Sequence, residues 1–276
     1  MMNKKILTLL PAFFIFTPLF IAFGEPVPKF TNYFSGNPLP EKTAYLTFDD
    51  GPSDWTERVL NILKEKDVKA TFFICANWQK GTTIKNNSFQ KYKQTLLRMR
   101  REGHSIGNHT RSHQNLAKLS REKIIEELDL NQKLLNEALE TESFEMTLIR
   151  PPYGSPWMNK EDETAKKQLS EILLKKGNIM LWSRHFVSGD TKDWVKGDWY
   201  EEGPKVDITQ EEFKTRMLYI YNRLIKRVDG KGMVVLFHDT HRTSTETLPK
   251  VIDKLKESGY KFDTMDGYIE WKNNLK

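Results

Sequence analysis

Short apolar runs alternate with longer amphipathic segments along most of the chain. In the segment 121–140, for example, Ile124, Leu128 and Leu135 lie on one side of a helix and the charged residues on the other. Compact apolar runs are typical of buried strands. The expected strands are 44–48, 70–76, 105–108, 146–149, 178–183, 233–237 and 260–264. The expected helices are 57–66, 89–102, 121–140, 164–176, 209–227 and 248–258.

Strands that alternate with helices are typical of a mostly parallel sheet, because a parallel pair needs a crossover connection that is usually a helix. The length of 276 residues suits one domain with a full-sized core. The pattern therefore predicts a single α/β domain with about seven strands. Right-handed crossovers are compatible with closure of the sheet into a barrel, which periodicity alone does not decide.

The N-terminus has the composition of a secretory signal peptide. Two lysines precede the uncharged stretch 6–23, and Ala22 and Gly24 are small residues at the two positions that a signal peptidase reads. We expect a cleaved signal peptide at residues 1–24 and an exported protein in the periplasm, the cell wall or the extracellular space. An uncleaved membrane anchor is the alternative, because the stretch is at the lower edge of a spanning length.

The chain that follows carries a mild charge. After residues 1–24 are removed, 41 Lys and Arg remain against 37 Asp and Glu, which leaves a net charge of +4. The two signs are interspersed, so the sequence indicates no nucleic-acid partner, and it indicates no stable protein partner. Cys75 is the sole cysteine, which excludes an intramolecular disulfide and predicts a buried, inert thiol in the apolar run 71–76.

Polar motifs begin where the expected strands end, at the edge of an α/β sheet where sites are usually assembled. The first contains Asp49 and Asp50, followed by Gly51-Pro52. Two adjacent carboxylates repel unless their roles differ, so one is suited to hold a cation while the other stays free as a base. The alternative is a turn with an N-capping acid.

The second motif contains His109 and His113, which lie on one face if the stretch is helical and are then suited to one metal ion. With a carboxylate at Asp50 they form a set of three ligands, which leaves coordination positions for water and substrate. His104, five residues earlier, is expected to be a packing or hydrogen-bonding histidine.

The third motif is Arg150-Pro151-Pro152-Tyr153-Gly154. The prolines hold the backbone extended, so Arg150 is suited to pair with a carboxylate such as Asp49, and the Tyr153 amide to donate to a developing oxyanion. A rigid loop with a surface arginine is the alternative.

The fourth and fifth motifs are Asp190–Trp194 and Leu236–Asp239. In the fourth, an acid is suited to orient a histidine and Trp194 offers a flat face to a sugar ring, although a solvated loop is the simpler interpretation. In the fifth, His238 is either a core histidine or a general acid at the rim, and Leu236 on the same strand face is suited to line a pocket for a methyl group.

Together the motifs TFDDGP, HTRSH, RPPYG, DTKDW and LFHD resemble, in order, those of the polysaccharide deacetylase family of carbohydrate esterases, over roughly residues 42–270. The resemblance implies that residues 42–276 form a catalytic domain with a distorted (β/α) barrel, preceded by a linker or N-terminal wrap at 25–41. It also implies one divalent metal ion, usually zinc, with cobalt or nickel as alternatives, and hydrolysis of acetamido groups on N-acetylated sugars.

The resemblance also implies a role for individual residues. The metal ligands would be Asp50, His109 and His113. The catalytic group would comprise the base Asp49, its partner Arg150, the acid His238 and the tuning residue Asp193. The substrate-binding group would comprise the Tyr153 amide, Trp194 and Leu236.

One departure from the family pattern concerns the fourth motif. Residues 185–189 separate it from its strand, and the stretch 195–207 lengthens the path to His238. Asp190 is therefore an alternative to Asp193 as the partner of that histidine. The added residues are expected to shape one wall of the substrate groove.

Peptidoglycan is the expected substrate, because the protein is expected to be exported and shows no extra binding module. The alternatives are an N-deacetylase of chitin or of an exopolysaccharide and an esterase acting on acetyl-xylan. A glycoside hydrolase that uses the acids at the rim would leave the histidine pair without a role. A silent glycan-binding protein is the other distant alternative, and the complete set of ligands and acid–base residues speaks against it.

Overall fold

The structure is a computed structural model that describes residues 31–78, 83–141, 143–158, 163–183, 209–225 and 228–275. Within these ranges the strands are β1 (Thr43–Asp49), β2 (Thr71–Ile74), β3 (Ser105–Asn108), β4 (Leu148–Ile149), β5 (Asn178–Ile179), β6 (Met233–His238) and β7 (Lys261–Phe262). The α-helices are α1 (Thr56–Glu65), α2 (Ser88–Lys91), α3 (Lys93–Arg101), α4 (Arg121–Leu139), α5 (Glu163–Leu173), α6 (Gln210–Ile225), α7 (Arg242–Glu257) and α8 (Met265–Asn273). Two 3-10 turns are η1 (Leu116–Lys118) and η2 (Pro152–Gly154).

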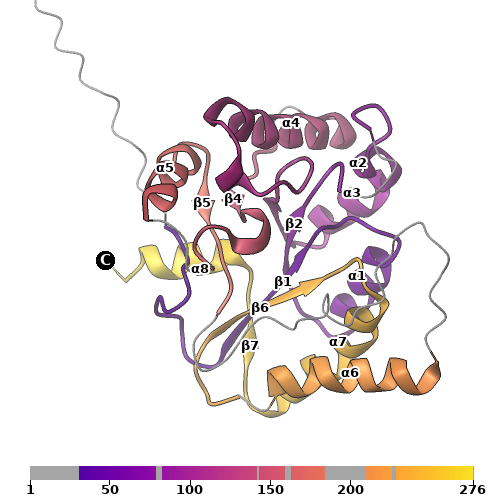
Figure 1. Ribbon diagram of the computed structural model, residues 1–276. Coiled ribbons are helices and arrows are strands. Elements are labelled where there is room, and N and C mark those ends of the chain that lie inside the picture. Colours follow the sequence, from indigo (N-terminus) through magenta and orange to yellow (C-terminus); the bar gives the residue numbers. More distant parts are fainter. Residues whose placement is uncertain are drawn as a thin grey trace, which may run out of the picture.

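The strands form one parallel sheet in the order β5-β4-β3-β2-β1-β6, and β7 also pairs with β1. Figure 1 shows the helices arranged around this curved sheet. The two outer strands, β5 and β6, approach each other. The Ser183 amide, a few residues after β5, donates to the Val234 carbonyl of β6 at 3.1 Å, and the Val234 amide donates to the Ser183 hydroxyl at 3.0 Å. These features confirm the predicted α/β fold, a distorted barrel of about seven parallel strands.

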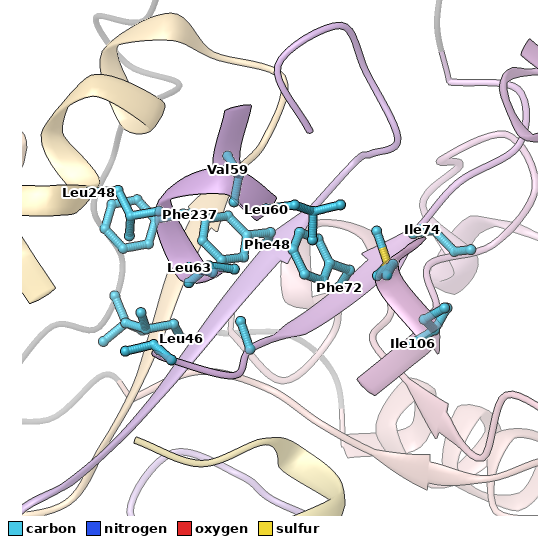
Figure 2. Packing of buried hydrophobic residues seen from close by; sticks show 14 of the residues in the cluster. Leu46, Phe48, Val59, Leu60, Leu63, Phe72, Ile74, Ile106, Phe237 and Leu248 are labelled. Atoms are coloured by element: carbon cyan, nitrogen blue, oxygen red, sulfur yellow. The ribbon is translucent and has the colours of Figure 1, made fainter. Parts of the chain in front are cut away.

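The two faces of β1 have different environments. Ala44, Leu46 and Phe48 belong to the main core beneath the helices (Figure 2), where the Phe48 ring stacks on Phe72 and Phe237 at centroid distances of 5.0 and 5.6 Å. The residues between them point to the inside of the barrel, since successive side chains of a strand alternate between faces. This alternation brings Asp49 to the inner side of the rim.

Two helices differ from the sequence expectation. The helix expected at 89–102 is divided into α2 and α3 by Tyr92, whose backbone leaves the helical region at φ −107° and ψ 30°. The Tyr92 hydroxyl donates to Asp54 at 2.6 Å, so the break accompanies a contact with the loop after β1. Helix α7 begins at Arg242, six residues before the expected start, because its first turns bury Thr243, Ser244 and Thr247 rather than apolar residues.

The C-terminal helix α8 was not expected from the sequence. Thr264 caps it by accepting from the Gly267 amide, and Met265 and Tyr268 are its buried residues. Strand β5 is also shorter than expected, because the backbone beyond Ile179 bridges to Tyr33 instead of continuing the strand.

Residues 31–41 are the described part of the expected linker or wrap. Tyr33 is buried there, forms an isolated parallel bridge with Met180, and shares a hydrogen bond of 2.8 Å with the Ser183 hydroxyl. The expected boundaries stay predictions, and the expected signal peptide lies outside the described residues. Within the described ranges, no helix combines the length and the apolar character needed to span a membrane.

Two residues that were expected to be structural are so. Cys75 is buried, and burial raises the pKa of its thiol well above the usual range, as expected for an inert cysteine. His104 is buried with its Nδ1 accepting from the Ala70 amide at 3.1 Å and its ring edge-on to Phe72 at 5.5 Å. Burial lowers the pKa of His104 from 6.5 to about 4.

The His104 imidazole therefore makes stability depend on pH. Between pH 6.5 and about 4, the unfolded chain binds a proton at this residue and the folded chain does not. The contribution of His104 to the free energy of unfolding is complete above pH 6.5 and decreases as the pH falls towards 4. We expect His104→Asn, which keeps an acceptor for the Ala70 amide, to flatten this decline in urea denaturation at a series of pH values. A His104 imidazole that titrates near 6.5 by NMR would contradict this account.

Candidate active site

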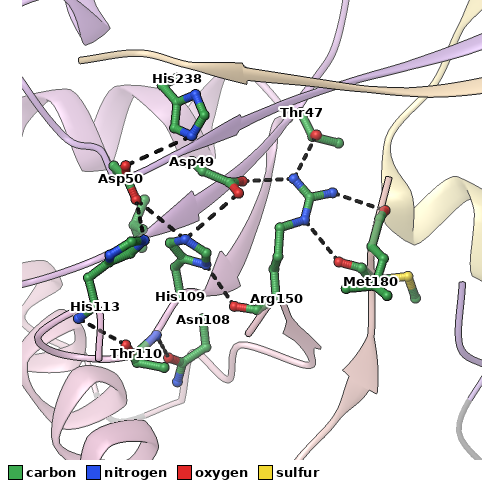
Figure 3. A network of polar contacts seen from close by, with 12 residues as sticks. Thr47, Asp49, Asp50, Asn108, His109, Thr110, His113, Arg150, Met180 and His238 are labelled. Atoms are coloured by element: carbon green, nitrogen blue, oxygen red, sulfur yellow. Dashed lines mark hydrogen bonds and ion pairs between the residues drawn. The ribbon is translucent and has the colours of Figure 1, made fainter. Parts of the chain in front are cut away.

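Four of the five motifs meet at the carboxyl ends of the strands (Figure 3). Strand β1 ends in Asp49 and β6 ends in His238. Strands β3 and β4 end directly before His109 and Arg150. Asp49 and His238 are register partners on neighbouring strands. Residues far apart in the sequence therefore form one cluster because the sheet is parallel.

Asp50, His109 and His113 form a buried acid–histidine group. One Asp50 oxygen, Oδ1, lies 3.3 Å from His109 Nε2 and 3.2 Å from His113 Nε2. One ligand atom from each residue lies within 4.8 Å of the other two. The same Asp50 oxygen is buried without a hydrogen-bond donor among the described residues. The predicted set of three is thus assembled.

The protonation states of these three residues favour a cation between them. His109 Nδ1 contacts the Arg150 carbonyl at 2.7 Å, and because a carbonyl only accepts, Nδ1 carries the proton and Nε2 presents a lone pair to Asp50. Burial lowers the pKa of His113 to about 4, so this ring is neutral at pH 7. Burial alone would raise the pKa of Asp50, but His113 and the other nearby histidines bring it well below its usual range.

In the neutral ring, the lone pair on His109 Nε2 faces the Asp50 oxygen 3.3 Å away, and these two acceptors repel each other unless a cation lies between them. One oxygen and two nitrogen ligands suit a divalent transition metal or zinc, and a set of three leaves positions for water and substrate. The residues present therefore fit the metal ion that the sequence predicts.

The backbone of the histidine motif corrects one expectation. The sequence predicts that the two histidines share a face if the stretch is helical, but the stretch forms a turn instead. Thr110 and His113 lie in the left-handed region at φ 69° and 55°. Those dihedrals, rather than a helical period, direct both imidazoles to Asp50.

Asp49 is paired with Arg150 as expected. The Arg150 side chain is fully buried, and its Nη1 donates to Asp49 Oδ1 at 2.7 Å and to Thr47 Oγ1 at 2.7 Å. Its other nitrogens donate to the carbonyls of Met180 at 2.9 Å and Leu181 at 3.2 Å. The guanidinium thus neutralises the buried carboxylate and leaves its second oxygen, Oδ2, 3.7 Å from His109 Nε2.

Asp50 lies in the left-handed region at φ 73°, and this explains how two consecutive acids reach one site. In a regular strand they would point to opposite faces. Gly51 follows with no room for a side chain, since a Cβ there would collide with the carboxylate of Asp239. Asp239 in turn accepts from Thr56 Oγ1 at 2.5 Å, and burial raises its pKa to about 7.

The remaining predicted residues lie around this group. His238 Nε2 is 4.0 Å from Asp50 Oδ2, at the end of β6, and Leu236 is buried two residues earlier on the same strand face. Tyr153 is 57% exposed, and its ring meets His113 edge-on at 4.7 Å. The positions of Asp190, Asp193 and Trp194 lie outside the described residues, so the partner of His238 stays a prediction.

Several residues that shape the site are not identified by the sequence motifs alone. Thr47 accepts a hydrogen bond from the buried Arg150 guanidinium. Asp239 is part of the LFHD motif, but the motif does not indicate that its carboxylate packs against Gly51 in the turn after β1. Glu127 on α4 accepts hydrogen bonds from the histidine turn. In the sequence, Glu127 is marked by its position three residues after Ile124, within the apolar stripe of α4.

Comparisons with known proteins agree with this arrangement. The profile of the polysaccharide deacetylase family matches residues 36–172. A peptidoglycan-N-acetylglucosamine deacetylase of Bacillus cereus is 31% identical over 231 residues, which cover 82% of this chain and 70% of that protein. The chain therefore belongs to the polysaccharide deacetylase family and is a hydrolase of that class.

Solved structures show the same fold. PdaC of Bacillus subtilis, a peptidoglycan deacetylase, matches with a TM-score of 0.62 and 28% identity over 86% of this chain and 94% of the solved chain. The full PdaC protein, named a peptidoglycan-N-acetylmuramic acid deacetylase, is longer, and this chain covers 40% of it. A chitin deacetylase of the fungus Colletotrichum lindemuthianum matches with a TM-score of 0.62 and 27% identity over 85% of this chain and 89% of that one.

The buried ion pair yields a stability prediction. Arg150→Met leaves the Asp49 carboxylate buried without its counter-ion and two carbonyls without donors. We expect a loss of about 3–5 kcal/mol in the free energy of unfolding and a melting temperature lower by roughly 10 °C. The control is Arg58→Met, whose ion pair with Glu246 is exposed at the surface and which should change little. Equal melting temperatures for the two variants would contradict the prediction.

Proposed function

We propose that this protein is an exported, metal-dependent enzyme that hydrolyses acetamido groups of peptidoglycan and releases acetate. The observation that carries the proposal is the meeting of the Asp50–His109–His113 group with a second carboxylate, Asp49, and with His238 at one rim. A zinc ion is our choice of metal for this ligand set. Cobalt and nickel are the alternatives.

When bound, a divalent cation supplies Lewis-acid polarisation of the acetyl carbonyl and acidifies a water molecule. The protein must then bind the substrate, accept one proton and return one. Asp50 and the two imidazoles are the residues that would hold the cation. Their orientation is preset, because the Arg150 carbonyl fixes the tautomer of His109.

Asp49 is the base in this proposal. Arg150 occupies one of its oxygens, so Oδ2, which faces the histidines, is the oxygen that accepts the proton from the attacking water. The buried guanidinium also prevents the carboxylate from rotating away, since it is itself held by Thr47 and two carbonyls.

The leaving nitrogen needs a proton, and His238 is the residue placed to donate it. It lies on the β6 side of Asp50, whereas His113 lies on the other (Figure 3), and the Tyr153 ring contacts His113. The Tyr153 amide, three residues after Arg150 in the 3-10 turn η2, is suited to donate to the oxyanion. Leu236 would contact the acetyl methyl group.

The choice of peptidoglycan is supported by the names of the relatives. The Bacillus cereus relative is named for N-acetylglucosamine and PdaC for N-acetylmuramic acid, and both names specify peptidoglycan. The fungal structure is a chitin deacetylase, so chitin oligomers are the second candidate. Export rests on the sequence of residues 1–24.

The role of the base is tested by Asp49→Asn. This variant keeps the shape of the side chain and cannot accept the proton, so we expect acetate release to fall by at least about 10³-fold while the bound metal is retained. Asp129→Asn, a change on the exposed face of α4, is the matched control and should keep full activity. Retained turnover in Asp49→Asn would refute the assignment.

The substrate and the metal are tested together by acetate release from peptidoglycan, chitin oligomers and acetyl-xylan, with and without chelator. We expect release from peptidoglycan to exceed that from the other two, to stop with chelator and to return with added zinc. Activity on acetyl-xylan alone would assign an esterase instead. Chain cleavage without acetate, or glycan binding without turnover, would contradict the proposal.

A further inference from the structure

Glu127 is a buried charge that the proposed chemistry does not use. It lies on the inner side of α4, is 2% exposed, and is not among the atoms grouped around Asp50. Its Oε1 accepts from Arg111 Nη2 at 2.8 Å and from Ser112 Oγ at 2.8 Å, and its Oε2 accepts from the Ser112 amide at 2.8 Å. Its backbone carbonyl accepts from the Arg111 amide at 3.0 Å.

All four hydrogen bonds come from Arg111 and Ser112, two of the three residues between the histidines of the proposed cation site. The turn that contains these residues is unfavourable by itself, since Thr110 and His113 have left-handed backbones without being glycines. Such conformations persist only where the surrounding structure holds them. One residue of α4 therefore fixes the middle of the turn from both its side chain and its backbone.

The negative charge of Glu127 matters as much as its shape. A guanidinium and an amide only donate, so a carboxylate with two accepting oxygens satisfies each of them. A glutamine of the same size would place an N–H group against one of these donors. The turn would then lose a hydrogen bond and gain a repulsive contact.

We propose that Glu127 is a positioning residue that holds the His109–His113 turn in its metal-binding shape and thereby raises the affinity for the cation. The inference rests on the proposed cation site. Without Glu127, the turn must be ordered at the expense of binding free energy. The residue contacts neither the reacting atoms nor the cation, so its loss weakens metal binding and leaves the chemical step intact.

The test is the dissociation constant for Zn²⁺, measured at 25 °C by competition with a chromophoric chelator, in Glu127→Gln and the unaltered protein. We expect binding about tenfold weaker, with kcat and KM restored once zinc is saturating. The matched control is Glu126→Gln, the neighbouring position on α4, whose exposed carboxylate pairs with Lys123. Its affinity should be unchanged.

A merely structural role predicts a different result. In that case Glu127→Gln lowers the melting temperature but leaves zinc affinity within twofold, which would overturn the inference. If that variant does not fold, Ser112→Ala decides, because it removes one of the bonds to Oε1 and should weaken zinc binding about threefold. Unchanged affinity in Ser112→Ala would overturn the inference as well.

The two proposals fail in distinguishable ways. If the unaltered protein binds no divalent cation, the proposed function fails together with the role of Glu127. If it binds zinc and releases acetate, and Glu127→Gln binds equally tightly, only the inference about Glu127 fails.

Discussion

The pairing of Arg150 with Asp49 is the interaction on which the site depends. The guanidinium is fully buried, and its donors reach β1, the backbone beyond β5 and the carboxylate itself. The carbonyl of the same residue accepts from His109. Because an unpaired buried charge is destabilising, each partner stabilises the other in the folded protein. The residue that pairs with the proposed base Asp49 therefore also orients His109, one of the two imidazoles proposed to hold the cation.

Much of the site was predictable because its chemistry is carried by few residue types at strand ends. Asp50, His109 and His113 were identified from their ligand atoms and from their place after expected strands, and the structure brings them together. The condition of a helical stretch is not met, because Thr110 and His113 have left-handed backbones. Left-handed backbones at ordinary residues leave no periodic signal, so the turn was not visible in the sequence.

Other features depend on partners far away in the chain. Glu127 and Asn131 lie within the apolar stripe of α4, and Asn131 bonds to the Ile74 carbonyl and to Asn108 Oδ1. A polar residue in such a stripe indicates a buried partner but does not identify it. Helix α7 began earlier than expected because buried threonines and serines imitate a polar loop. Residues 190–194, which contain the fourth motif, still rest on sequence alone.

The register of β1 and β6 has a consequence for specificity. Asp49 and His238 are directly opposite each other on adjacent parallel strands, which lie about 4.8 Å apart. The spacing of the strands, and not the loops, thus sets the separation of the two backbone positions that carry the proposed base and acid. Changes in loop length can alter the surface around the site while this backbone separation stays constant.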